Sequence, residues 1–89
     1  TYCYPNPITE NGGTIRVETF GSTKVDIDIY DLAGYFIKSF KGKSNHSGIQ
    51  IKEFQWVTLN VNPGVYFAHV SAINDNKMQT KIIKIAVVD

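Results

Sequence analysis

Residues 25–40, VDIDIYDLAGYFIKSF, decide the fold of this chain. Polar residues alternate with three β-branched residues, Val25, Ile27 and Ile29, and a period of two places those three on one face of a strand. Asp31 and Gly34 supply a tight turn, because an Asp side chain can bond its own backbone and a Gly accepts positive φ. The chain returns through Ile37 and Phe40, which we expect to face the same core. The stretch therefore predicts a half-buried antiparallel hairpin.

Alternating residues and turn signals divide the rest of the chain in the same way. Alternation predicts four further strands, over residues 15–20, 49–57, 65–73 and 79–88. In the second of these the apolar parity slips between Ile51 and Phe54, which indicates a bulge. Residues 8–13 and 41–48 are polar and carry glycines, so they predict loops. Pro5-Asn6-Pro7 predicts an extended turn that leads off an edge strand.

These segments describe an all-β domain. Asn62-Pro63-Gly64 is another turn signal, since Pro presets the bend and Gly accepts the conformation that closes it. No stretch carries a helical period with caps. Six clear strands, or seven with the N-terminal segment, are separated by turns at short intervals. This spacing predicts an antiparallel β-sandwich of immunoglobulin-like architecture.

Composition limits the possible classes of function. The chain has 89 residues, which make one domain, residues 1–89. Its net charge is +1 and the basic residues are scattered, so no nucleic-acid partner is expected. No apolar run approaches the roughly 18 residues of a membrane span. The chain begins at Thr1 and its single methionine is Met78, so we expect a module excised from a larger exported protein.

Four short motifs stand in a familiar order. They are YPNP at residues 4–7, IYDLAG at 29–34, NPGVYF at 62–67 and KIIKIAVV at 81–88. In this order and spacing they resemble the C-terminal sorting domains of the type IX (Por) secretion system of Bacteroidetes-type bacteria. They are also similar to the immunoglobulin-like module of flagellar hook-capping proteins.

The resemblance implies a sorting role without catalysis or cofactors. Such a domain directs an attached cargo through the periplasm and across the outer membrane, so the protein is secreted or stays at the cell surface. The implied partners are an outer-membrane translocon, a sortase-like peptidase and a cargo domain on the N-terminal side. The resemblance places translocon recognition in the last strands, on Pro63, Gly64, Val65, Tyr66, Lys81, Lys84, Ile85, Val87 and Val88.

The residues also leave other functions open. One is a structural immunoglobulin-like module that spaces or docks domains of an extracellular protein. Another is a carbohydrate-binding module, whose exposed rings would come from Tyr30, Tyr35, Trp56, Tyr66 and Phe67. The last strand is apolar on both faces for half its length. If it lies at an edge, it predicts strand addition to a partner or an edge-strand homodimer.

Catalysis and metal binding have few candidate residues. Cys3 with His46 or His69 is the thiol–imidazole combination that the sequence offers, and a small buried thiol is the ordinary alternative. His69 has no further ligands spaced for a metal. Asp26, Asp28 and Asp31 are carboxylates of the kind that Ca²⁺ prefers. Asp26 and Asp28, however, point together from a strand without a glycine-bearing loop around an ion, so they predict a solvated sheet face. We therefore expect no enzyme.

Overall fold

The computed structural model describes residues 2–9, 12–20, 23–44, 49–58, 61–74 and 77–88. They form seven strands: β1 (Tyr2–Thr9), β2 (Gly12–Phe20), β3 (Thr23–Asp31), β4 (Phe36–Ser44), β5 (Ile49–Trp56), β6 (Gly64–Asn74) and β7 (Lys77–Val87). These ranges hold no helix, and so none that could cross a membrane. The predicted all-β class is confirmed.

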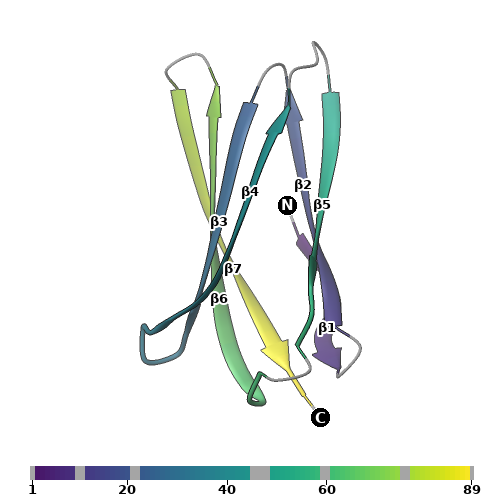
Figure 1. Cartoon of the computed structure of the whole chain (residues 1–89), viewed down its shortest axis with the longest axis vertical. Helices are drawn as coiled ribbons and strands as arrows, with labels where there is room; N and C mark the ends of the chain where they lie inside the picture. The colour runs from purple at the N-terminus through teal and green to yellow at the C-terminus, as the bar shows by residue number, and fades with distance from the viewer. Residues whose placement is uncertain are drawn as a thin grey trace.

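The strands form two antiparallel sheets that face each other (Figure 1). One sheet has the order β4-β3-β6-β7 and the other β1-β2-β5. On one side the sheets meet where Ile8 of β1 pairs in parallel with Val87 of β7. On the other side the rings of Phe40 on β4 and Phe54 on β5 lie 5.9 Å apart between their centroids. This is the expected immunoglobulin-like sandwich.

β1 changes sheets along its length. Its first residues, from Tyr2 to Tyr4, and its last residue, Thr9, pair with β2, whereas Ile8 pairs with β7. The register with β2 is interrupted between these two parts, across Pro5-Asn6-Pro7, because proline has no N–H to donate to a ladder. The expected turn at residues 5–7 is thus a strand segment that crosses between sheets. The predicted loop over 8–13 is likewise wrong at both ends, since β1 runs to Thr9 and β2 begins at Gly12.

The core consists of alternate residues that point between the sheets. Its buried members are Cys3, Ile8, Ile15, Val17, Val25, Ile27, Ile29, Trp56, Tyr66, Ala68, Val70, Ile85 and Val87. β3 contributes the three β-branched residues that the hairpin pattern predicts, and none of the three is exposed. On β6, Ala68 and Val70 are buried while His69 between them is exposed. Period-two alternation therefore identifies the inner face of both central strands.

The hairpin of residues 25–40 is confirmed except for the position of Ile37. Phe40 lies opposite Ile27 and packs against the core. Ile37 is 36% exposed, because it is the extra residue of an irregular register in which Lys38 faces Ile29 and Phe36 faces Tyr30.

Two further expectations about the edge strands are wrong. β4 extends to Ser44, so the first half of the predicted loop 41–48 is strand. Lys41 and Lys43 are exposed there, and charged side chains are typical of an edge strand. The rest of that loop, including His46, lies outside the described residues. β5 has no bulge, since its register with β2 is unbroken from Ile49 to Trp56. The parity slips because Ile51 faces outward, 42% exposed, whereas Phe54 and Trp56 face the core.

Candidate functional site

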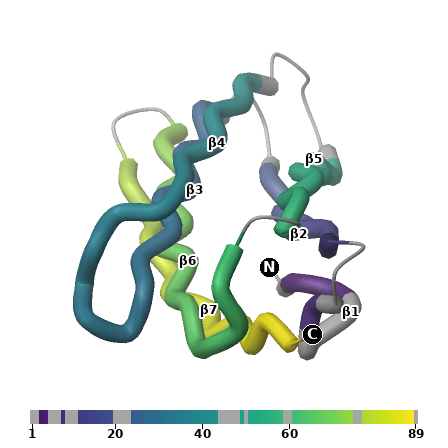
Figure 2. Tube along the Cα trace, turned by 60° about the horizontal axis from the view of Figure 1, so that its bottom comes forward, coloured from purple at the N-terminus to yellow at the C-terminus, as the bar shows by residue number. Residues whose placement is uncertain are grey.

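All four sequence motifs meet at one end of the sandwich (Figure 2). Asp31, at the end of β3, lies opposite Tyr66 on β6, and Tyr66 lies opposite Ile85 on β7. Two residues farther along β7, Val87 lies opposite Ile8, which directly follows the YPNP motif. We call this the motif end of the sandwich and define it by these five residues. Motifs separated by up to eighty residues of chain thus form one continuous structure.

The IYDLAG motif closes the β3–β4 hairpin at this end. The Asp31 N–H donates to the Tyr35 carbonyl at 2.9 Å, and the Gly34 N–H donates to the Asp31 carbonyl at 3.0 Å. The Asp31 carboxylate also accepts from the Tyr35 N–H at 2.8 Å. Gly34 has a φ of +93°, which an L side chain rarely adopts. The predicted roles of Asp31 and Gly34 in the turn are confirmed.

Tyr66 joins the two sheets and the NPGVYF turn. Its ring is 6% exposed and meets the Trp56 ring edge-on, with centroids 5.5 Å apart. Its hydroxyl donates to the Asn62 carbonyl at 2.5 Å. Burial, and then the negative charge of Asp31, raise the pKa of Tyr66 above its ordinary value. Tyr66 therefore stays a neutral donor and fixes the start of β6 against the core.

β6, β7 and β1 form a corner of the motif end. Gly64 lies opposite Val87, and the Val88 N–H donates to the Ile8 carbonyl at 2.8 Å. Next to these pairs, several residues of β6 and β7 and of the adjoining turn are accessible to solvent. We call this surface the terminal corner and define it by Pro63, Gly64, Val65, Lys84 and Val88. Four of the five are exposed and Val65 is half-buried.

The nine residues predicted for translocon recognition fall into three groups. Five of them form the terminal corner. Tyr66, Ile85 and Val87 belong to the buried core beneath it, so their side chains support the corner but do not form its surface. Lys81 lies elsewhere: it pairs with Val70 on the row of β7 that faces the other sheet, whereas Lys84 pairs with Phe67 on the outer face. The two lysines therefore do not lie on one surface.

The other candidate sites do not assemble from the described residues. Cys3 is a core residue of β1, whereas His69 is exposed on β6. Burial raises the pKa of the Cys3 thiol from 9.0 to about 11, which disfavours the thiolate that nucleophilic chemistry needs. Asp26 and Asp28 alternate with the core residues of β3 and so lie on its outer face. No group of three His, Cys, Asp or Glu side chains in the described ranges could hold a metal ion.

The rings proposed for a carbohydrate platform do not share a surface. Trp56 is 1% exposed and Tyr66 is 6% exposed, because both fill the core. Tyr35 is exposed in the β3–β4 turn, and Tyr30 and Phe67 are half-buried on paired positions of β3 and β6. A platform made of these five rings is therefore wrong: a core this thin takes its largest side chains from the aromatic residues.

The sequence did not predict one exposed apolar segment at the motif end. Leu32 and Tyr35, in the β3–β4 turn, are 73% and 72% exposed, and Phe36 beside them is 57% exposed. The sequence does contain a signal for this exposure: apolar residues in a tight turn lie away from the strands that form the core. In this turn the sequence predicted roles for Asp31 and Gly34 and none for the apolar residues beside them.

Comparisons with known proteins agree with this architecture. PorU of Porphyromonas gingivalis, in the crystal structure of its dimeric latent form, matches with a TM-score of 0.78 and 22% identity, over 98% of this chain and 9% of that chain. PorZ of the same organism is described as an essential bacterial surface component of the type-IX secretion system. It matches with a TM-score of 0.64 and 25% identity, over 99% of this chain and 11% of that chain. The C-terminal domain of Wzt matches with a TM-score of 0.56 and 18% identity, over 92% of this chain and 63% of that chain.

The chain thus spans about a tenth of the length of PorU and PorZ. A search of curated proteins gives no match. At the level of sequence, residues 2–85 match the family described as "Secretion system C-terminal sorting domain". That match includes three of the four motifs in full and most of the fourth. The chain belongs to this family, the C-terminal sorting domains of type IX secretion.

Proposed function

We propose that this domain directs an attached cargo through the type IX route by presenting the terminal corner to the secretion machinery. Proteins that carry the domain are exported by this route to the cell surface or the extracellular space. The sorting-domain family is non-catalytic, and the proposed mechanism needs no chemistry. The remaining question is which surface the machinery recognises.

One observation carries the choice of the terminal corner. Residues from the start of β6 and the end of β7 meet there, because Gly64 lies opposite Val87 and the Val88 N–H bonds to Ile8. Their side chains are largely accessible, whereas the motif residues beneath them are buried. An outer-membrane translocon that binds the folded domain can contact only the accessible members. A sortase-like peptidase would then act on the cargo side.

A secretion assay with matched charge reversals tests the proposal. Residues 1–89 are fused behind a periplasmic fluorescent reporter in a host that has the type IX machinery. Lys84→Glu changes the terminal corner, and Lys77→Glu makes the same change at the opposite end of β7, where Lys77 lies opposite Asn74. Both lysines are exposed, so both variants should fold.

The expected result is a loss of surface reporter for Lys84→Glu and normal export for Lys77→Glu. Equal export of both variants would refute the terminal corner as the recognised surface. If the unmodified fusion stays in the periplasm although it is folded, sorting itself is refuted. The domain would then be a structural spacer.

Dimerisation through β7 stays a prediction. Ile85 is fully buried, so a Lys there would unfold the core instead of testing an interface. Ile82 is 59% exposed on the outer face of the same strand, and Ile82→Lys leaves the core intact. Sedimentation of the unmodified domain and this variant at high concentration is the test. A monomer in both cases would exclude the dimer.

A further inference from the structure

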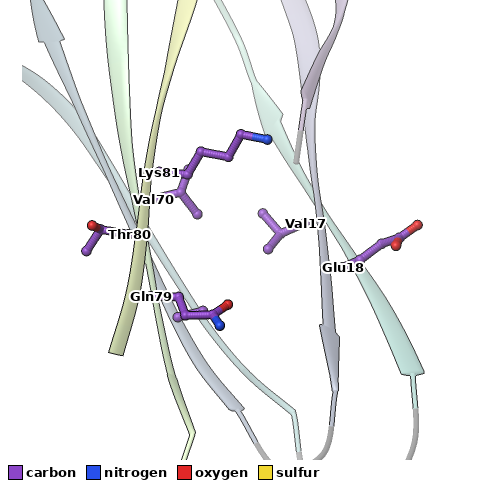
Figure 3. Close-up of a pocket in the computed structure, with 7 residues that line it drawn as sticks. Val17, Glu18, Val70, Gln79, Thr80 and Lys81 are labelled. Atoms are coloured by element: carbon purple, nitrogen blue, oxygen red, sulfur yellow. The ribbon is translucent and has the colours of Figure 1, made fainter. Parts of the chain in front are cut away.

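The outer face of the four-stranded sheet, β4-β3-β6-β7, changes character along its length. Lys41, Asp26, Ser71 and Thr80 lie side by side across its four strands. Figure 3 shows Thr80 projecting away from the other sheet, whereas its neighbour Lys81 projects toward it. This row is polar, as is usual where a sheet faces solvent. Nearer the motif end, the same face carries aromatic and apolar side chains instead.

These aromatic and apolar side chains lie next to one another. Tyr30 on β3 lies opposite Phe36 on β4 and Phe67 on β6. Two residues after Phe67, His69 lies opposite Ile82 on β7. The Tyr30 ring meets the Phe36 and His69 rings edge-on, with centroids 5.9 Å and 4.9 Å apart. We call this surface the aromatic patch and define it by these five residues.

The aromatic patch has the character of an interface centre. Phe36 and Ile82 are 57% and 59% exposed, and the other members are exposed or half-buried. None of the five is a lysine, an arginine or a carboxylate, whereas Asp28 borders the patch opposite His69. Accessible aromatic side chains with charges confined to the rim are typical of protein interfaces. The rest of the same sheet face does not show this arrangement.

Lys84 connects the aromatic patch with the terminal corner. It belongs to the corner and lies directly opposite Phe67 on the outer face. On the other side of the patch, Phe36 directly follows the exposed Tyr35 of the β3–β4 turn. A specific interface takes about 800 Å² and roughly 20–30 residues from each partner, many more than the five residues of the corner. A protein seated on the corner therefore extends over neighbouring surface, and the patch is apolar surface that adjoins it.

We propose that the aromatic patch is the apolar centre of the surface that the secretion machinery binds, with the terminal corner at its rim. Domains of this family are recognised by that machinery, so the occupant is one of its proteins. Such a partner presents apolar side chains to Phe36 and Ile82 and a carboxylate on the side of Lys84. The inference rests on the proposed function, because it extends the surface proposed there.

Export of the reporter fusion tests the patch with matched glutamine substitutions. Phe36→Gln removes an exposed ring from the patch. Met78→Gln is the control: Met78 is 62% exposed on the same face of the same sheet, but lies opposite Ile73 at the end away from the terminal corner. Ile82→Gln is a second change within the patch. The unmodified fusion and Lys84→Glu are measured beside these three, and Tm is measured for each purified domain.

The expected result is at least about fivefold less surface reporter for Phe36→Gln and for Ile82→Gln, with normal export of Met78→Gln. Fivefold corresponds to the loss of about 1 kcal/mol that a central interface side chain exceeds. Normal export of Phe36→Gln at an unchanged Tm would overturn the proposal, and so would an equal loss for Met78→Gln. If Phe36→Gln lowers Tm, the result for Ile82→Gln decides in the same way.

Failure of this proposal is distinguishable from failure of the proposed function. If Lys84→Glu blocks export while the patch variants are exported, the corner is recognised without the patch, and the proposed function stands. If the unmodified fusion stays in the periplasm, the sorting function itself is refuted together with the patch. A dimer in sedimentation that Phe36→Gln dissociates would also overturn the proposal, because the patch would then bind a second copy.

Discussion

Replacement of Tyr66 by Phe should destabilise the domain modestly and in a way that identifies the cause. The substitution removes the hydroxyl that donates to the Asn62 carbonyl at 2.5 Å. It keeps the ring and its edge-on contact with Trp56, so no cavity forms. The loss is that of one partly buried hydrogen bond, about 0.5–1.5 kcal/mol in the free energy of unfolding.

This magnitude corresponds to a measurable change in melting temperature. Unfolding entropy of roughly 2.1 cal/mol/K per residue gives about 0.19 kcal/mol/K for a chain of 89 residues. Tyr66→Phe should therefore lower Tm by about 3–8 °C, measured by circular dichroism or calorimetry. Tyr66→Ala serves as the control, because loss of a buried ring costs about 3–5 kcal/mol and should lower Tm by roughly 16–26 °C.

The ratio of the two effects tests the reasoning. If Tyr66→Phe is as damaging as Tyr66→Ala, the ring is not what joins the two sheets. If Tyr66→Phe is as stable as the unmodified protein, the hydrogen bond to Asn62 adds nothing to folding. Tyr66 would then not fix the start of β6 in the way argued above.

Three further outcomes are expected. In urea unfolding, Gly12→Ala should lower the free energy of unfolding by about 1–3 kcal/mol more than Gly34→Ala does. Both glycines have positive φ, but an added Cβ at Gly12 would lie 2.5 Å from the Trp56 carbonyl oxygen while Gly34 faces open space; equal costs would contradict the clash. The free energy of unfolding should fall by up to about 3 kcal/mol between pH 9 and 11, since the unfolded Cys3 thiol loses its proton at a lower pH than the folded one, whose pKa is about 11. Cys3→Ala should remove that part of the slope, and an unchanged slope would show that Cys3 does not cause it. Ile82→Lys should leave Tm within about 3 °C of the unmodified value, because Ile82 lies outside the core; a larger drop would mean that this face is covered.

Much of the fold follows from the sequence, because side-chain alternation is a local property. Val25, Ile27 and Ile29 identify the inner face of β3 without knowledge of any neighbour. The alternation fails where a residue's face depends on a partner strand. Ile37 and Phe40 are three residues apart and would lie on opposite faces of a regular strand. Only pairing with β3 shows that Ile37 is an extra residue in the register.

The sequence did not predict which strands lie at the edges of the sheets. Residues 41–44 are polar, and polarity is typical both of loops and of exposed edge strands. Ile51 is apolar, yet it faces outward on an edge strand. The crossing of β1 between sheets depends on Ile8 meeting Val87, nearly the whole chain away. Such long-range pairs leave no local pattern.

The sequence was also insufficient to predict which motif residues are accessible at the candidate site. The NPGVYF and KIIKIAVV motifs contain both buried and exposed residues, and the sequence alone does not distinguish the two kinds. Tyr66, Ile85 and Val87 are buried, so packing of the core accounts for their presence in the motifs. Pro63 and Lys84 are exposed and lie where packing makes no comparable demand. If the proposed function holds, recognition of the folded domain depends mainly on the second kind, because a partner contacts accessible side chains. We expect substitutions in the first kind to impair export through loss of the fold, so export measured together with Tm separates the two kinds.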